Sequence, residues 1–179
     1  MRALEHARLR LEPQVEGHAA EMFAVLSDPA IYEHENAPPC SVAWLADRYR
    51  KLESRVSPDG TERWLNWVVR LPTGELAGYV QATVHASGRA AIAYELNSRY
   101  WGRGIASAAV ERMIAELAAA YGVETLGAVL KQANARSRRL LERLGFAPAP
   151  EALRKEAEAG PDELLMVRSA APGSNLTLP

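Results

Sequence analysis

The chain has 179 residues and a formal net charge of −1, with 48% hydrophobic and 24% charged residues. That length suits one domain with a substantial core, and the near-neutral charge excludes a general positive field that would recruit nucleic acid. No apolar run approaches the ~20 residues that span a bilayer, and the single Cys40 excludes an internal disulfide and fits a reducing, cytoplasmic compartment.

The first third of the chain predicts one strand followed by two helices. The elements, in order, are a strand over 7–11, a helix over 16–26, an irregular segment over 31–40 and a helix over 42–54. Period-two alternation indicates the strand, and apolar residues at helical spacing indicate the helices. Ser41 is well suited to cap the second helix. Trp44, Trp64 and Trp67 are candidates for the core or for a homodimer interface.

A strand meander and then alternating helices and strands fill the rest of the chain. The elements, in order, are strands over 63–71, 76–84 and 90–96, a helix over 107–121, a strand over 125–130, a helix over 134–144, a weak strand in the 150s and a strand over 164–167. This order predicts a single α/β domain over residues 1–169, with a mixed, mostly antiparallel sheet and helices on both faces. The parallel part is expected where the strand at Tyr94 crosses over to the strand at Leu126. Residues 170–179 are expected to form a flexible tail.

The segment 99–106 (Arg-Tyr-Trp-Gly-Arg-Gly-Ile-Ala) predicts an anion site. It connects a strand to a helix, and its two glycines allow a tight turn and close approach of a ligand. The first N–H groups of a helix lack partners within the helix, and the helix dipole favours negative charge at that end. A phosphate or pyrophosphate is the expected guest; the alternative is a plain strand-to-helix connection.

Three classes of phosphate ligand compete for this segment. A P-loop is improbable because the lysine and the hydroxyl that follow its second glycine are missing. A dinucleotide site is half matched by residues 102–107, and Glu124 has the right offset for the ribose. Only one crossover unit is visible, however, and it follows a meander, which weakens this interpretation. The third class, an acyl carrier, has a second motif in its favour.

That second motif occupies residues 134–146. It contains N-x-x-S at Asn134 and Ser137, then a helix, and it ends in Gly145-Phe146. Together with R-x-x-G-x-G-x-A at 99–106, it strongly resembles the GNAT superfamily of acyl-coenzyme A-dependent N-acetyltransferases, over roughly 7–167. Within the superfamily the chain looks most like the ribosomal-protein N-terminal acetyltransferases (the RimJ/RimL type), on residues 9–11, 26–29 and 100–104 as well.

The resemblance implies the GNAT fold, in which the parallel strands at the centre of the sheet splay apart to admit acetyl-CoA as co-substrate. No metal is implied, and the four scattered histidines have no metal-ligand spacing. Backbone N–H groups of 101–106 would hold the diphosphate, and the pantetheine arm would pair with the strand edge at 96–97. The cofactor-binding residues implied are Leu96, Asn97, Arg99, Trp101, Gly102, Arg103, Gly104, Ile105, Ala106, Asn134 and Ser137. One of Arg103, Arg138 and Arg139 would contact the 3′-phosphate.

The reaction implied is direct attack of a primary amine, either a protein N-terminus or a small-molecule amine, on the thioester. A base matters most for lysine-like amines, which at pH 7 are neutral less than about once in a thousand. Glu95 is the first candidate for this base, with Glu156 or ordered water as alternatives. Many GNAT enzymes carry a tyrosine acid on the helix before Gly-Phe, which this chain lacks; Ser137 matches the residue given that role in the ribosomal-protein branch.

Two further expectations concern the acceptor and a rival function. His34 and Glu35 lie in the loop that resembles the family's acceptor-binding region, so they are candidates for shaping acceptor choice. The missing tyrosine and the open choice of base leave a second hypothesis from another class. It is a non-catalytic acyl-CoA-binding or regulatory module on the same fold.

Overall fold

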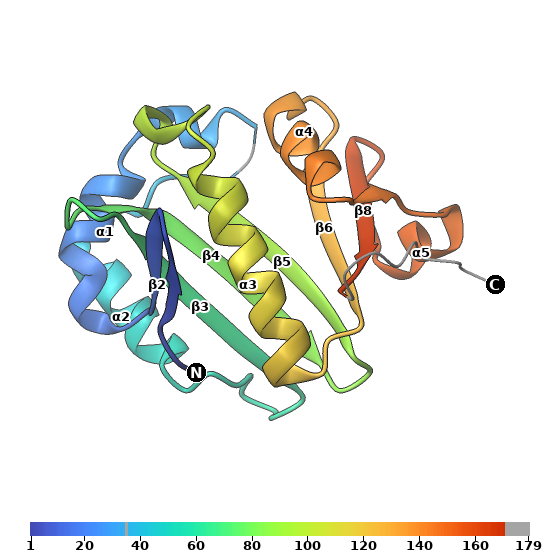
Figure 1. Ribbon diagram of the computed structural model, residues 1–179, viewed down its shortest axis with the longest axis horizontal. Coiled ribbons are helices and arrows are strands. Elements are labelled where there is room, and N and C mark those ends of the chain that lie inside the picture. Colours follow the sequence, from blue (N-terminus) through green and yellow to red (C-terminus); the bar gives the residue numbers. More distant parts are fainter. Residues whose placement is uncertain (35, 171–179) are drawn as a thin grey trace.

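An eight-stranded sheet forms the centre of the computed structural model, which describes residues 1–34 and 36–170 (Figure 1). The strands are β1 (Leu4–His6), β2 (Leu9–Pro13), β3 (Glu62–Arg70), β4 (Leu76–His85), β5 (Arg89–Leu96), β6 (Thr125–Lys131), β7 (Ala147–Pro148) and β8 (Glu163–Ser169). Their order in the sheet is β1-β2-β3-β4-β5-β6-β8-β7, and β5 with β6 is the parallel pair. The predicted mixed, mostly antiparallel sheet is therefore confirmed.

Helices cover both faces of this sheet, as expected. They are α1 (Ala19–Leu26), α2 (Val42–Leu52), α3 (Ile105–Tyr121), α4 (Ala135–Arg143) and α5 (Glu151–Glu156), with 3₁₀ turns η1 (Glu16–His18), η2 (Pro29–Tyr32) and η3 (Ser98–Tyr100). Strand β3 shows why two cores form. Trp67 and Val69 pack in the core shared with α3 and α4, whereas Val68 packs in the core shared with α1 and α2. Alternate side chains of a strand point to opposite faces, so a strand buried on both faces reads as a continuous apolar run.

The parallel pair β5–β6 is short, and this shortness positions the site. Its register consists of Arg89↔Thr125, Ala90↔Leu126 and Ala91↔Gly127. Beyond these pairs the two strands diverge towards their carboxyl ends, where α3 begins and α4 lies (Figure 1). Strand β6 stays paired with β8 as far as Lys131↔Glu163. The splayed centre that the family resemblance implied is thus present.

The structure corrects two local expectations. The weak strand expected in the 150s is wrong, because Glu151–Glu156 form α5. Those residues are mostly good helix formers, with an acidic side chain in the first turn and basic ones in the last. Strand β1 was not expected, since three residues are too few to show a period.

The boundaries of the described chain bear on two other expectations. Ala170 is buried, and its N–H donates to the Glu124 carbonyl at 2.8 Å. The remainder of the expected tail, 171–179, lies outside the described residues, and so does Glu35. Within the described part of the chain, no helix combines the length and the apolar character needed to cross a membrane.

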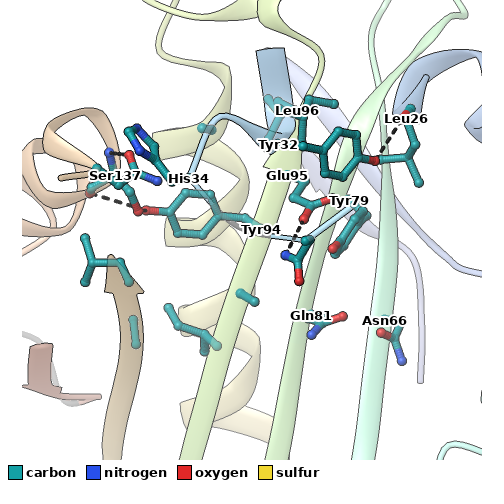
Figure 2. A pocket seen from close by; sticks show the side chains of 18 of the residues that line it. Leu26, Tyr32, His34, Asn66, Tyr79, Gln81, Tyr94, Glu95, Leu96 and Ser137 are labelled. Carbon is teal, nitrogen blue, oxygen red and sulfur yellow. Dashed lines mark hydrogen bonds between the residues drawn. The ribbon is translucent and has the colours of Figure 1, made fainter. Parts of the chain in front are cut away.

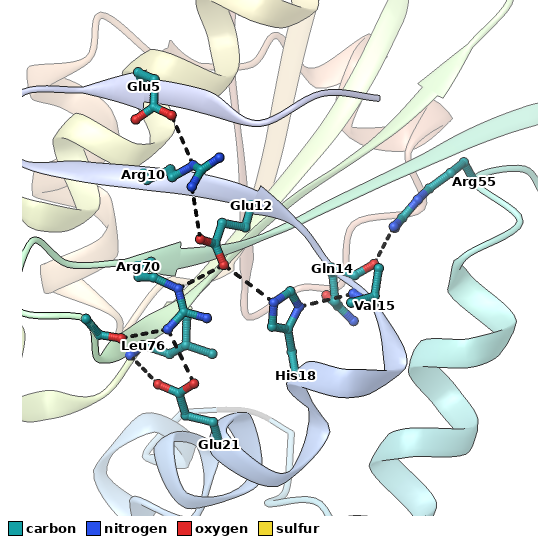
Figure 3. A network of polar contacts seen from close by, with 11 residues as sticks. Glu5, Arg10, Glu12, Gln14, Val15, His18, Glu21, Arg55, Arg70 and Leu76 are labelled. Atoms are coloured by element: carbon teal, nitrogen blue, oxygen red, sulfur yellow. Dashed lines mark hydrogen bonds and ion pairs between the residues drawn. The ribbon is translucent and has the colours of Figure 1, made fainter.

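A polar network joins the N-terminal hairpin to the sheet and α1 (Figure 3). Arg70 Nε donates to Glu12 Oε2 at 2.9 Å, and the Arg70 Nη1 group donates to the Gly74 carbonyl at 2.6 Å. Glu21 accepts from the Leu76 N–H at 2.8 Å. The Arg70 and Glu12 side chains are 26% and 18% exposed, so water screens this pair only in part. The Arg70 Nη1 group also donates to Glu21 Oε2 at 3.4 Å, so Arg70 joins β3 to β2 and to α1, both distant in sequence.

Replacing Arg70 is expected to destabilise the fold. Arg70→Ala should lower the free energy of unfolding by about 1–3 kcal/mol, because the half-buried Glu12 carboxylate loses a charged donor. The measurement is urea-induced unfolding followed by circular dichroism. The control is Lys51→Ala, whose ion pair with Asp47 is between side chains 75% and 50% exposed, and which should cost clearly less stability because water screens the pair. Equal losses of unfolding free energy in the two variants would contradict a stabilising role for the Arg70 network.

Candidate functional site

A cavity of about 490 Å³ occupies the divergence between β5 and β6. At one end it is lined by Trp101, Asn134 and Ser137, from the glycine turn and α4. At the other end it is lined by Tyr49 and Asn66, beneath α2 on the opposite face of the sheet. The cavity therefore passes through the sheet, from the glycine turn and α4 at one end to α2 at the other.

The glycine turn presents free backbone donors to solvent at the start of α3. Gly102 and Gly104 have left-handed φ values of +73° and +75°, which glycine adopts without strain. Among the described residues, none accepts a hydrogen bond from the backbone N–H groups of 102–107, and no side chain caps α3. The Trp101 N–H already donates to the Ser98 carbonyl at 3.0 Å, so the free donors begin one residue later than expected. Such a turn suits a diphosphate.

Arg8 adds a positive charge to this turn, and the sequence did not point to it. A Cβ atom on Gly104 would lie 2.9 Å from Arg8 Nη1, so the guanidinium lies directly against the turn. Arg8 belongs to the β1–β2 hairpin, which is distant in sequence, and no local motif marks it. Of the three arginines expected near the 3′-phosphate, Arg138 is paired with Glu142 at 2.8 Å.

The residues expected to bind coenzyme A divide into two groups. Those that line the cavity are Leu96, Trp101, Ala106, Asn134 and Ser137. Those that lie outside its lining are Asn97, Arg99, Gly102, Arg103, Gly104 and Ile105. The second group includes the exposed glycines of the turn, where a diphosphate would sit on the surface. The first group thus lies in the cavity, and the second lies outside its lining, at the turn and the strand end that precedes it.

Trp101 lies between the two groups, because it lines the cavity and directly precedes Gly102. Its Nε1 donates to the Leu96 carbonyl at 2.9 Å, and the Arg136 guanidinium stacks on its ring at 3.5 Å. The Asn97 N–H donates to the Ala77 carbonyl of β4 at 2.9 Å. Two backbone groups of the edge expected to pair with pantetheine are therefore already engaged. Arg136 thereby joins α4 to the glycine turn.

A tyrosine approaches Ser137 from an unexpected direction. The Tyr94 hydroxyl lies 2.7 Å from Ser137 Oγ, across the divergence from β5 to α4 (Figure 2). Burial raises the pKa of Tyr94 to about 12, against smaller opposing effects of the Ser137 hydrogen bond and the Arg143 charge. Asn134 caps α4 by accepting from the Ser137 N–H at 3.0 Å. The tyrosine that many GNAT enzymes carry on the helix is absent from α4, and the facing strand β5 supplies one that the sequence had not indicated.

Glu95 follows Tyr94 but faces the other side of the sheet. Asn36 Nδ2 donates to Glu95 Oε1 at 3.3 Å, and Tyr79 is the cross-strand neighbour of Glu95 on β4 (Figure 2). Burial, together with the charge of Glu95 and its hydrogen bond, raises the pKa of Tyr79 well above its ordinary value. His34 also lines the cavity. One strand therefore supplies adjacent residues to the two ends of the cavity.

Glu156, the alternative base, lies elsewhere. It forms an ion pair with Arg89 at the start of β5 and is 59% exposed, and it is not part of the cavity lining. Arg89 and Glu95 are separated by most of the strand, which at ~3.3 Å per residue is roughly 20 Å. The structure thus brings Glu95 to the cavity and leaves Glu156 at the far end of the strand. No group of three or more metal-ligating side chains is placed to hold an ion within residues 1–34 and 36–170.

The sequence of this chain is similar to a known protein family and to a curated relative. The family model of the acetyltransferase (GNAT) domain matches residues 8–147. The uncharacterized N-acetyltransferase YoaA of Bacillus subtilis (strain 168) is 33% identical over 146 residues, which cover 80% of this chain and 81% of YoaA.

Two solved structures share the fold at low sequence identity. RimL, a ribosomal L7/L12 alpha-N-protein acetyltransferase in complex with coenzyme A, has a TM-score of 0.78 at 14% identity, covering 93% of this chain and 97% of RimL. Mycobacterium smegmatis RimJ, in complex with CoA-disulfide, has a TM-score of 0.74 at 20% identity, covering 93% of this chain and 85% of RimJ.

Proposed function

Because this chain belongs to the GNAT acetyltransferase family, we propose that it transfers an acetyl group from acetyl-CoA to a primary amine by direct attack on the thioester. The observation that carries this proposal is the cavity that passes between β5 and β6. Consecutive residues of β5 serve its two ends: Tyr94 with Ser137 on one face, and Glu95 on the other. That arrangement suits a reaction in which sulfur leaves on one side while an amine attacks from the other.

The chain's own groups fit coenzyme A in two places. The free N–H groups of 102–107 and the Arg8 guanidinium suit its diphosphate, since both complement negative charge. The divergence beyond Ala91↔Gly127 suits its narrow pantetheine arm. When bound, the co-substrate supplies an acyl thioester, which an amine can attack without further activation by metal. Asn134 keeps its side-chain NH₂ as a donor to the arm, because its Oδ1 caps α4.

Protons move at both the amine and the sulfur. An amine that arrives protonated must lose one proton before it attacks, which we assign to the Glu95 carboxylate, held by Asn36 beside the cavity, and a second proton as the amide forms. The leaving thiolate resembles a thiol of pKa ~8.5, so it requires only modest help. We assign this help to Ser137, whose hydroxyl hydrogen is free to point at sulfur when the Tyr94 hydroxyl donates to Ser137 Oγ.

Turnover of acetyl-CoA tests the proposal. The protein is incubated with acetyl-CoA and a panel of N-terminal peptides, amino alcohols and polyamines, and free thiol and acceptor mass are both followed. Thiol release matched by acetylation of one acceptor is the expected result. Binding of coenzyme A without acetylation of any acceptor would favour a non-catalytic module, an alternative that relatives named N-acetyltransferase do not favour.

The cytoplasmic location and the homodimer stay predictions. Of the tryptophans considered for the core or an interface, Trp67 is fully buried in the core, while Trp44 is 47% exposed.

The Tyr94–Ser137 contact predicts coupled kinetic effects. Ser137→Ala should lower kcat about tenfold, which is below the usual range for general acid catalysis because the thiolate leaves readily. Tyr94→Phe should give a similar decrease, and the double variant should be no slower than either single variant, since the hydroxyls act as a unit. The measurement is steady-state kinetics, with Tyr121→Phe, outside the cavity, as the control. Independent, multiplying effects would contradict the coupling. With a pKa of about 12, Tyr94 keeps its proton through the neutral and mildly alkaline range.

A further inference from the structure

The acceptor end of the cavity has a floor of uncharged polar side chains. Asn66 of β3 pairs with Gln81 of β4 in the sheet register, and Tyr79 pairs with Glu95 one step along. Because alternate residues of a strand share a face, Asn66 and Gln81 lie on the same face as Glu95, and all of them line the cavity (Figure 2). The Gln14 N–H donates to the Asn66 carbonyl at 2.9 Å, which brings a third amide side chain to this floor.

Three residues around this floor are buried, and Gln81 is partly exposed. Gln14 and Asn66 are 3% and 4% exposed, and Tyr49, which covers them from α2, is 3% exposed. Within residues 1–34 and 36–170, the Tyr49 hydroxyl is buried with no hydrogen-bond partner, and no residue hydrogen-bonds to the side-chain amides of Gln14, Asn66 and Gln81, which line the cavity. Burying the Tyr49 hydroxyl unpaired costs free energy, and the three amides face the cavity with their hydrogen-bonding capacity unused. A ligand with matching hydrogen-bonding groups would satisfy them.

The charges around the floor limit what this ligand can be. Besides Glu95, the acidic and basic side chains that line the cavity, among the residues that the structure describes, are Arg48, Arg136 and His34. Arg136 stacks on Trp101 at the cofactor end, and Arg48 is exposed, with its guanidinium 5.8 Å from the Trp44 ring. Among the described residues, the buried part therefore offers a carboxylate for one amine, but neither a second carboxylate for a polyamine nor a buried arginine or lysine for an acid.

We propose that the acceptor is a small monoamine that carries hydroxyl groups a few bonds from its nitrogen. Glu95 takes the amine, and the amides of Asn66, Gln81 and Gln14 with the Tyr49 hydroxyl bind the hydroxyl groups. These side chains come from β3, β4, α2 and the residue that follows β2, so they can contact a compact ligand from several sides. A peptide N-terminus would instead offer its amides along one line leading out of the cavity. This inference rests on the proposed function, of which it specifies the acceptor.

A pair of matched amines tests the inference. Cyclohexylamine and trans-4-aminocyclohexanol share ring and amine and differ by one hydroxyl group. The wild type is expected to acetylate the aminoalcohol with a kcat/KM at least about tenfold higher, since a site built to bind a hydroxyl rejects the analogue that lacks it. Asn66→Leu and Tyr49→Phe should each reduce this preference severalfold and leave cyclohexylamine within about twofold. Gln132→Leu, which removes an exposed amide outside the cavity, is the control and should leave the preference unchanged.

Several outcomes would overturn the inference and leave the function intact. They are equal rates for the two amines, an unchanged preference in both variants, or faster acetylation of spermidine or of peptides. Tyr49→Phe keeps the test decisive if Asn66→Leu fails to fold, because it removes only an unpartnered hydroxyl. If no amine is acetylated, the proposed function fails. The inference is then decided separately by whether the aminoalcohol, and not cyclohexylamine, raises the melting temperature of the coenzyme A-bound protein.

Discussion

Glu95→Gln is expected to lower kcat/KM for a lysine-like amine by about 10²–10⁴-fold at pH 7, the range for loss of a general base. Such an amine, with a pKa near ~10.4, is almost entirely protonated at that pH, so a base must accept its proton. Glutamine keeps the size of the side chain and an acceptor oxygen for Asn36 Nδ2, but it cannot take a proton. The loss should therefore appear in the rate and not in the affinity for coenzyme A.

The pH profile separates a base from a merely structural carboxylate. In Glu95→Gln the amine must lose its proton to solvent, so the rate should rise about tenfold per pH unit until the pKa of the amine is reached. The deficit of the variant should consequently shrink as the pH rises. Glu156→Gln is the matched control, because Glu156 pairs with Arg89 outside the cavity, and its profile should follow the wild type. A deficit in Glu95→Gln that is constant with pH would assign Glu95 to positioning.

The second large effect is expected at the glycine turn. Gly104→Ala should raise the Kd for coenzyme A about 10- to 100-fold, equivalent to the loss of one charged hydrogen bond. The added Cβ would lie 2.9 Å from Arg8 Nη1, and the left-handed φ of +75° would be strained. Both effects move the N–H donors of 102–107 and the Arg8 charge out of register with a diphosphate. Isothermal titration calorimetry measures the change.

A second left-handed glycine gives the matched control. Gly60, in the turn before β3, has a φ of +74° and nothing within 4 Å of its added Cβ. Gly60→Ala should therefore cost a comparable ~1–2 kcal/mol of stability through backbone strain and leave the Kd unchanged. Should both variants bind coenzyme A as tightly as the wild type, residues 102–107 would not be the diphosphate site.

Strand β5 contains one site residue that the sequence predicted and one that it did not. The order of elements and the two motifs were enough to predict the sheet, the crossover and the family, because they depend on local periodicity and on short, contiguous patterns. Glu95 and Ser137 were also named in advance, and both line the cavity. Tyr94 was not, although it is adjacent to Glu95. Its contact with Ser137 requires β5 and α4 to diverge by a particular amount, which no local pattern specifies.

The polar floor of the cavity has a signal in the sequence. Asn66 and Gln81 are lone amides within otherwise apolar strand segments, and the hairpin register makes them direct neighbours. A polar residue inside such a run, opposite another across a predicted hairpin, marks a buried polar site. Arg8 had no comparable signal. It reaches Gly104 only because the N-terminal hairpin packs beside α3.

The sequence by itself determined the family, the mixed sheet and the position of the glycine turn, since strand alternation, helical spacing and glycine flexibility act within a few residues of each position. Only the tertiary structure decided which side chains meet. The pairing of Tyr94 with Ser137, the approach of Arg8 to Gly104 and the exclusion of Glu156 from the cavity depend on where β5 and β6 separate. That point is set by packing on both faces of the sheet at once, which joins residues far apart in the chain.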